Sequence, residues 1–225
     1  MTRRLARVLR LRRGERVLDV ACGRGGSALL LADEFAASVD GVDLGRASVE
    51  HARAEAIRRD LDGLTRFHVG DAERLPFPDA TFDVVICECS LCTFPDKDRA
   101  AAEFARVLRP GGRLGLTDVT LDPARLDPEL ATLAGSIACL AGARPAAEYE
   151  ALLATAGLET TVSEAHDYAL AHMVDQIDAR LRALGVLWTT NGPFDTEALL
   201  GHTARAAAAV ADGVAGYCLL VARRS

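Results

Sequence analysis

The feature that most constrains this sequence is a regular alternation of short apolar strands with helices over its first 120 residues. Strand patterns cover 16–20, 38–43, 66–69, 82–87 and 113–118, and helical patterns cover 27–37, 47–61 and 97–108. Such alternation produces a parallel sheet with helices on both faces. The strands show no regular polar positions, which is typical of strands buried on both sides. The sequence therefore predicts an α/β fold.

After residue 118 the pattern becomes mainly helical. We expect helices over 145–156, 171–184 and 196–211, and strands over 158–163 and 216–222. The last two helices form a predicted helical insertion at about 166–212, before the final strand. No linker or change of composition divides the chain, so we expect a single domain over 1–225. Residues 1–120 would form its cofactor-binding half and 121–225 its acceptor-side half.

Charge and composition exclude several kinds of partner. The net charge of −6 argues against a nucleic-acid surface, and the arginines between Arg3 and Arg16 are interpreted as the solvated face of an amphipathic helix. No apolar run approaches the roughly 18–20 residues of a membrane helix, and the first residues lack the apolar stretch of a secretory signal. Six cysteines in such a chain do not indicate a disulfide framework. We therefore expect a cytoplasmic protein that binds a small molecule, with no membrane or nucleic-acid partner.

A glycine-rich turn, Cys22-Gly23-Arg24-Gly25-Gly26, follows the first strand and opens a helix. Glycines let the backbone approach a ligand closely, and a helix N-terminus offers unpaired N–H groups. The spacing differs from the GxGxxG pattern of dinucleotide-binding proteins, and the chain contains no phosphate-binding GxxxxGK sequence. The turn therefore predicts a ligand site that is not built around nucleotide phosphates.

Two carboxylates follow the next strands. Asp43 ends the second strand about 20 residues after the glycine turn, a position that suits hydrogen bonds to ribose hydroxyls. Asp71 follows the third strand, where it can accept from an adenine amine beside the backbone N–H of Ala72. Both lie at the carboxyl ends of predicted parallel strands, where such sheets bind ligands.

Together these segments resemble the class I S-adenosylmethionine-dependent methyltransferases. The resemblance rests on five ordered motifs: 18–25, 41–44, 70–77, 82–85 and 107–112. It implies a Rossmann-like, seven-stranded, mostly parallel sheet whose last strand is antiparallel, and S-adenosyl-L-methionine as the cofactor. It places Asp43 at the ribose, Asp71 near the adenine, and the segment from Asp19 to Gly25 around the methionine part. The predicted cofactor-binding residues are Asp19, Ala21, Gly23, Gly25, Asp43, Leu44, Asp71 and Ala72; Ala21 stands where the family usually has glycine.

The end of the fourth strand, which faces the methyl group in this family, carries Cys87-Glu88-Cys89-Ser90-Leu91-Cys92. Thiolates are soft ligands for thiophilic atoms. This stretch and the segment around Cys139 resemble the arsenite methyltransferases more narrowly. The resemblance implies that Cys89 and Cys139 hold trivalent arsenic. The family's third cysteine has no clear counterpart in this sequence; apart from the resemblance, we consider Cys92 as a candidate third ligand and expect Glu88 near the methyl group. Glu88 and Cys92 depart from that family, which has asparagine at these positions.

Other interpretations of the acceptor site stay open. The commoner task of the superfamily is methylation of an oxygen, nitrogen or carbon atom of a small natural product or quinone, with the cysteines only lining the pocket. A structural zinc site or redox regulation at these cysteines is a further interpretation, although the double CxxC…CxxC pattern typical of zinc sites is missing. A third hypothesis is a module that binds S-adenosylmethionine, or acts through its thiols, without methyl transfer.

Overall fold

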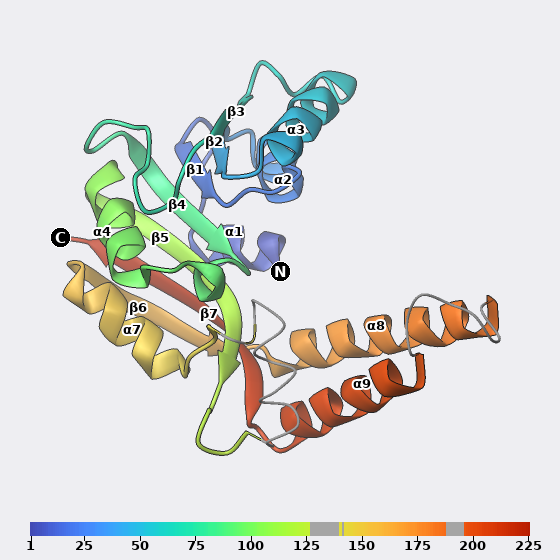
Figure 1. The fold of residues 1–225 in the computed structure, drawn as a ribbon. Helices are drawn as coiled ribbons and strands as arrows, with labels where there is room; N and C mark the ends of the chain where they lie inside the picture. Colours follow the sequence, from blue (N-terminus) through green and yellow to red (C-terminus); the bar gives the residue numbers. More distant parts are fainter. Residues whose placement is uncertain (127–139, 141, 188–195) are drawn as a thin grey trace.

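The computed structural model describes residues 1–126, 140, 142–187 and 196–225. In this part of the chain seven strands form one sheet in the order β3-β2-β1-β4-β5-β7-β6 (Figure 1). β1 to β5 pair with one another in parallel, and β7 is antiparallel to both β5 and β6. The strands are β1 (Arg16–Val20), β2 (Ser38–Asp43), β3 (Thr65–Val69), β4 (Phe82–Glu88), β5 (Leu108–Leu121), β6 (Leu158–Ala165) and β7 (Ala215–Arg224). The predicted α/β, Rossmann-like sheet is confirmed.

Helices cover both faces of the sheet and bury an apolar core on each side (Figure 1). One face carries α1 (Thr2–Val8), α2 (Gly26–Phe35) and α3 (Arg46–Arg58), and the other carries the short helix η1 (Leu91–Thr93), α4 (Lys97–Val107) and α7 (Ala146–Thr155). No helix among the described residues is long and apolar enough to cross a bilayer.

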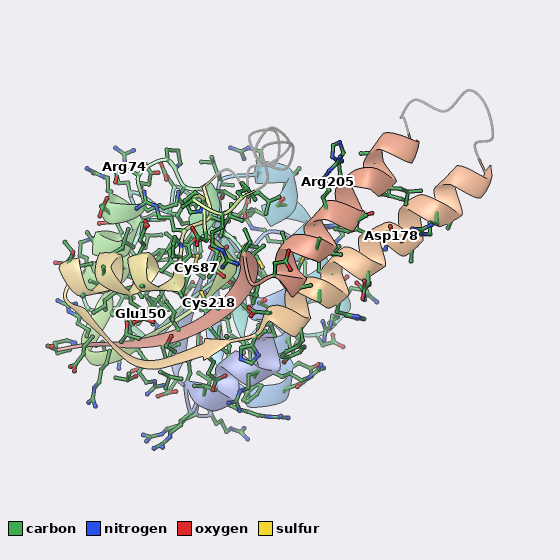
Figure 2. The ribbon with its side chains drawn as sticks, turned by 90° about the horizontal axis from the view of Figure 1, so that it is seen from below. Arg74, Cys87, Glu150, Asp178, Arg205 and Cys218 are labelled. Atoms are coloured by element: carbon green, nitrogen blue, oxygen red, sulfur yellow. The ribbon has the colours of Figure 1, made fainter. Side chains whose placement is uncertain are left out.

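The two remaining helices, α8 (Asp167–Leu187) and α9 (Thr196–Ala211), lie between β6 and β7 in sequence. They pack against each other as a hairpin that projects from one end of the sheet, with Asp178 on α8 and Arg205 on α9 (Figure 2). α8 begins at Asp167, earlier than the predicted 171, where the Asp167 Oδ1 accepts from the backbone N–H of Tyr217 at 3.0 Å. The insertion before the last strand is therefore present.

The central strand β5 is longer than expected. The sequence predicts 113–118, but the strand runs from Leu108 to Leu121. The prediction was wrong because β7 pairs with β5 continuously from Arg113 to Leu121, while Leu108 pairs with Phe82 of β4. These partners are distant in sequence, so the local pattern does not reveal the extra length.

Strand register brings the candidate residues to one edge of the sheet. Val20 of β1 lies opposite both Val42 of β2 and Cys87 of β4, and Cys87 lies opposite Leu116 of β5. The residues that follow these positions therefore come together at the carboxyl edge of the parallel strands, as expected for a ligand site in such a sheet.

Candidate functional site

The turn after β1 is held in a strained, left-handed backbone conformation. Ala21, Gly23 and Gly25 have φ angles of 55°, 53° and 82°. Such angles are costly for residues with a Cβ, which explains why glycine is common at the position of Ala21 in the family that the sequence resembles. A Cβ on Gly25 would approach the Ala52 Cβ to 2.9 Å and the Phe67 ring to 3.0 Å. The turn therefore packs directly on α3 and β3.

Asp43 links two backbone turns at the tip of β2. Its Oδ2 accepts from the N–H of Gly23 at 2.8 Å, and its Oδ1 accepts from the N–H of Gly45 at 2.8 Å. A carboxylate has about four acceptor sites, so each oxygen retains capacity for a ligand hydroxyl. Asp43 is therefore fixed in position before any ligand arrives.

A cavity of about 260 Å³ opens beside Asp43. Five of the eight predicted cofactor-binding residues are among those that line it: Ala21, Asp43, Leu44, Asp71 and Ala72. Leu44 is 77% exposed, so a flat apolar ligand could cover it. The Asp71 Oδ1 accepts from the N–H of Glu73 at 2.9 Å, which orients that carboxylate. The polar rim and exposed leucine form a site suited to a nucleoside.

Two buried carboxyl groups lie at the ends of β1 and β4. Asp19 is 2% exposed, and among the described residues its Oδ2 has no hydrogen-bond partner. The same holds for the Oε1 of Glu88, whose Oε2 accepts from the Thr2 hydroxyl at 3.2 Å. Burial raises the pKa of both groups, and the charge of Glu88 raises the pKa of Asp19 further. Such a pair favours a positively charged ligand group, which would offset the repulsion.

Cys89 follows β4 with a φ of 53°, and this turn brings its thiol to β7. The Cys89 Sγ lies 2.6 Å from the Tyr217 hydroxyl, which also donates to the Thr117 Oγ1 at 3.0 Å. Burial is the main cause of the raised pKa of Tyr217. Sequence reasoning missed Tyr217, because only strand pairing brings it to the end of β4.

Cys92 lies in a different environment. Its backbone N–H donates to the Asp118 Oδ2 at 2.8 Å, and its thiol also hydrogen-bonds to Asp118. Cys87 and Cys218, both labelled in Figure 2, belong to the core beneath α4 and α7 and interact electrostatically with the same carboxylate. Thr117 and Asp118 are consecutive strand residues, so their side chains point to opposite faces of the sheet. The contact of Cys92 with Asp118 and the contact of Cys89 with Tyr217 and Thr117 therefore lie on opposite faces of the sheet.

The other predicted ligand, Cys139, lies outside the described residues. Within the part of the chain that the structure describes, no three or more His, Cys, Asp or Glu side chains are arranged to hold a metal ion. The structure therefore describes two of the three candidate thiol ligands, Cys89 and Cys92.

A second and larger cavity, of about 390 Å³, lies between the α8–α9 hairpin and the ends of β5 and β7. We call it the hairpin cavity. Its lining is almost entirely aliphatic, with His202 and Thr203 as the polar exceptions: Val119, Leu121, Leu126, Leu140, Leu170, Met173, Val174, Ile177, Leu181, Leu199, His202, Thr203, Ala206, Ala209, Val210 and Ala215. The α8 residues that line the cavity are three or four positions apart, as on one face of a helix. This spacing is visible in the sequence. What the sequence does not show is that a cavity remains where the hairpin meets the ends of β5 and β7.

Comparison with known proteins decides the family. A model of a methyltransferase domain matches residues 18–116. The 27-O-demethylrifamycin SV methyltransferase of Amycolatopsis mediterranei is 39% identical over 166 residues, which cover 73% of this chain and 61% of that protein. The solved cyclase SpnF is 31% identical, with a TM-score of 0.77 over 99% of this chain and 79% of that one. This chain belongs to the S-adenosylmethionine-dependent methyltransferases. A solved geranyl diphosphate C-methyltransferase of Streptomyces coelicolor, 19% identical with a TM-score of 0.78 over 100% of this chain and 80% of that one, shares the fold and is described in complex with S-adenosyl-L-homocysteine.

The acceptor is not decided by family membership. An arsenite methyltransferase of Halobacterium salinarum is 34% identical over 153 residues, which cover 65% of this chain and 38% of that protein. The rifamycin relative is named for an organic acceptor, and SpnF is named as a cyclase. The chain spans about three fifths or less of the length of the first curated relatives it matches. The members of this family therefore differ in what they act on.

Proposed function

We propose that this chain transfers the methyl group of S-adenosylmethionine to an oxygen atom of an apolar organic molecule. The observation that carries the proposal is the hairpin cavity, whose volume of about 390 Å³ falls in the range of small-molecule sites. An aliphatic lining with a few polar groups binds an organic ligand by burying its apolar surface. The name of the rifamycin relative, an O-methyltransferase of an organic compound, supports the choice of acceptor.

The cofactor-binding residues form one continuous set in this proposal. Asp43 would bind the ribose, Asp71 would lie near the adenine, and Leu44 would cover one face of the nucleoside. The segment from Ala21 to Gly25 would enclose the methionine part. Asp19 would face the positive charge of the methionine part. This role fits the Asp19 Oδ2, a buried carboxylate oxygen that has no hydrogen-bond partner among the described residues. When bound, S-adenosylmethionine supplies a methyl group on a positively charged sulfur, so the donor needs no further activation by the protein.

The protein's remaining tasks are to align the acceptor and to exclude water. The aliphatic walls of the hairpin cavity serve both tasks, because they leave the acceptor few polar contacts and displace solvent. Glu88 ends β4 at the carboxyl edge, and its pKa is raised by burial, although hydrogen bonds from Ser27 and Thr2 oppose the shift. A carboxylate with a raised pKa binds a proton more readily. We therefore assign Glu88 the role of general base, which takes the proton from the hydroxyl group that is methylated.

Filling the hairpin cavity tests the acceptor site. Ala206 lines the cavity, whereas Ala207 on the next helical position is exposed. Ala206→Phe is expected to lower S-adenosylhomocysteine formation from an apolar phenol or a hydroxylated macrocycle at least tenfold, because the new ring occupies the acceptor volume. The affinity for S-adenosylhomocysteine, measured by calorimetry, should stay within twofold.

Ala207→Phe is the matched control and is expected to keep the activity of the original chain. If both variants lose activity equally, or if neither does, the hairpin cavity is not the acceptor site. A panel of phenols, hydroxylated macrocycles, arsenite and methylarsenite, each with and without excess thiol, defines the acceptor class in the same assay.

A second candidate acceptor is trivalent arsenic. Cys89 lies at the end of β4, with its thiol 2.6 Å from the Tyr217 hydroxyl, and the chain shares 34% identity with the Halobacterium arsenite methyltransferase. In this alternative Cys89 and Cys139 would hold the metalloid, and the arsenic lone pair would accept the methyl group, whereas Cys92 contacts Asp118 on the other face of the sheet. In this alternative thiolates bind the acceptor, whereas an organic acceptor would bind in the hairpin cavity.

Replacement of cysteine by serine distinguishes between the organic acceptor and the arsenic acceptor. If arsenic is the acceptor, Cys89→Ser and Cys139→Ser should each abolish methylation of arsenite, because the hydroxyl is a poor ligand for a thiophilic atom. Cys218→Ser, at a cysteine buried in the core, controls for the loss of a thiol alone. For an organic acceptor, we expect Cys89→Ser to change turnover by less than threefold. Full arsenite methylation in the Cys89 variant would contradict the arsenic alternative.

A further inference from the structure

The wall of the hairpin cavity offers a ligand no hydrogen bond from the described residues. Two of the side chains that line it are polar, yet no polar atom of the described lining is exposed in the cavity. The Thr203 hydroxyl donates to the Asp178 Oδ1 of α8 (Figure 2) at 2.6 Å, and the His202 Nδ1 is buried. A ligand hydroxyl, carbonyl or amide would therefore be buried there without a partner, which is unfavourable. The part of a ligand that this cavity accepts is hydrocarbon.

The hairpin cavity is elongated along the two helices. Its lining runs from Leu170 to Leu181 on α8 and from Leu199 to Val210 on α9. An α-helix rises 1.5 Å per residue, so each of these eleven-residue steps covers about 16 Å. A dry cavity of about 150 Å³ holds one benzene ring, so a volume of about 390 Å³ has room for roughly twelve to fifteen carbon atoms. Length and volume together suit a hydrocarbon chain.

Strand pairing connects this cavity with the proposed general base. Glu88 of β4 is paired with Thr117 of β5, so their side chains point to the same face of the sheet. Val119 lies two residues further along β5 on that face and lines the cavity. The cavity therefore begins about 7 Å along β5 from the residue that is paired with Glu88. One molecule can place a hydroxyl at Glu88 and a chain in the cavity.

We propose that the hairpin cavity binds an unsubstituted hydrocarbon chain of the acceptor, and that the hydroxyl to be methylated lies outside it, at the carboxyl edge beside Glu88. This inference rests on the proposed function, because it names the class of acceptor which that site takes. The acceptor is an amphiphile, in which a hydroxylated polar end is joined to an apolar chain. Met173 and Ile177 line the cavity and are 41% and 44% exposed, so the chain has an entrance from solvent along α8.

Two isomeric probes test the binding of the chain without methyl transfer. 1,2-Decanediol has both hydroxyls at one end, whereas 1,10-decanediol has one at each end. Displacement of an environment-sensitive dye from the chain measures the affinity of each. 1,2-Decanediol is expected to bind at least tenfold more tightly, because the second hydroxyl of its isomer would be buried without a partner. From 1-hexanol to 1-decanol, each added methylene group should strengthen binding by up to about fourfold.

Methionine NMR shows where the probes bind. The chain contains two methionines, Met1 and Met173, and Met173 is the one that lines the cavity. In the methionine-methyl-labelled chain, 1,2-decanediol should move the Met173 resonance, which Met173→Leu identifies, and leave that of Met1 unchanged. Ala206→Phe, which fills the cavity, should weaken the binding of 1,2-decanediol at least tenfold. Ala207→Phe, at an exposed position, is the matched control and should leave this affinity within twofold.

Three outcomes would overturn the inference. Equal affinities for the two diols would show that the binding site accepts a polar group at its far end. Probe binding that leaves the Met173 resonance in place would show that the chain binds outside the hairpin cavity. A Met173 resonance that moves with protein concentration, and not with the probe, would show that a second copy covers the cavity.

Failure of the proposed function is distinguishable from failure of this inference. Binding of 1,2-decanediol in the cavity, with no S-adenosylhomocysteine formed from any hydroxylated amphiphile, would remove the reaction and keep the chain-binding site. Turnover of a phenol with the same KM whether or not it carries an alkyl chain would remove the chain-binding site and keep the reaction.

Discussion

Replacement of Asp43 by alanine is expected to weaken the binding of S-adenosylhomocysteine about 10²- to 10⁴-fold. The expected size follows from two charge-assisted hydrogen bonds to the ribose, each of about 1.5–3 kcal/mol. The carboxylate is held for this task by the N–H groups of Gly23 and Gly45, both at 2.8 Å. Isothermal titration calorimetry with S-adenosylhomocysteine measures the loss directly, without turnover.

The Asp43 experiment needs a control for the charge and another for the fold. Asp62 is exposed, so Asp62→Ala removes one negative charge away from the cofactor cavity and should leave the affinity within twofold. Thermal unfolding of Asp43→Ala without ligand shows whether the variant stays folded after it loses the hydrogen bonds to the two turns. An affinity loss below threefold in a folded Asp43→Ala variant would exclude the ribose assignment.

The second large effect concerns Asp19, for which stability and cofactor affinity should change in opposite directions. The pKa of Asp19 is raised mainly by burial and then by the charge of Glu88, while a hydrogen bond from the backbone of Ala28 opposes the shift. Asp19→Asn keeps the shape and removes the charge. At about pH 8 we expect the variant to be more stable by about 1–3 kcal/mol, the range for an uncompensated buried polar group.

The dependence on pH follows from the direction of the pKa shift. In the unfolded chain the carboxyl has an ordinary pKa near 3.9, and in the folded chain the pKa is higher. Below about pH 4 both states hold the proton, so the raised pKa contributes its full stability there. As the pH rises through the folded pKa, that contribution is lost. The stability advantage of Asp19→Asn should therefore appear with rising pH and be absent near pH 4.

Cofactor binding supplies the second readout for Asp19. Removal of a negative charge that faces the methionine part should weaken the binding of S-adenosylmethionine about tenfold or more at neutral pH. Chemical denaturation from about pH 4 to 8 and calorimetry with the cofactor measure the two effects, with Asp62→Asn as the control. A variant that loses stability at all pH values, or binds the cofactor unchanged, would refute the role given to Asp19.

Much of the fold was predictable because its signals are local. β1, β2 and α9 have the bounds that the sequence predicts, since apolar runs and turn residues define each one without distant partners. The same holds for the cavity of about 260 Å³, where Asp43 ends β2 and Asp71 lies two residues after the end of β3. Parallel strands bring their carboxyl ends to one edge, so the order of strands is enough to bring these residues together.

The acceptor side was less predictable because long-range pairing arranges it. Cys89 and Cys92 are three residues apart in sequence, yet they contact Tyr217 and Asp118 respectively, on opposite faces of the sheet. The backbone turn at Cys89 and the antiparallel pairing of β5 with β7 produce this separation. Spacing along the chain therefore does not reveal that these two thiols have different protein contacts.

The sequence by itself determined the sheet, its glycine turn and the carboxylates of the cofactor site, because each depends on residues adjacent along the chain. Only the tertiary structure decided the length of β5, the hairpin cavity and the orientation of Thr203 in its lining. A periodic apolar stripe shows which face of a helix is buried but not what fills the space against it. That space is set by how two helices and two strand ends pack, and packing joins residues that are distant in sequence.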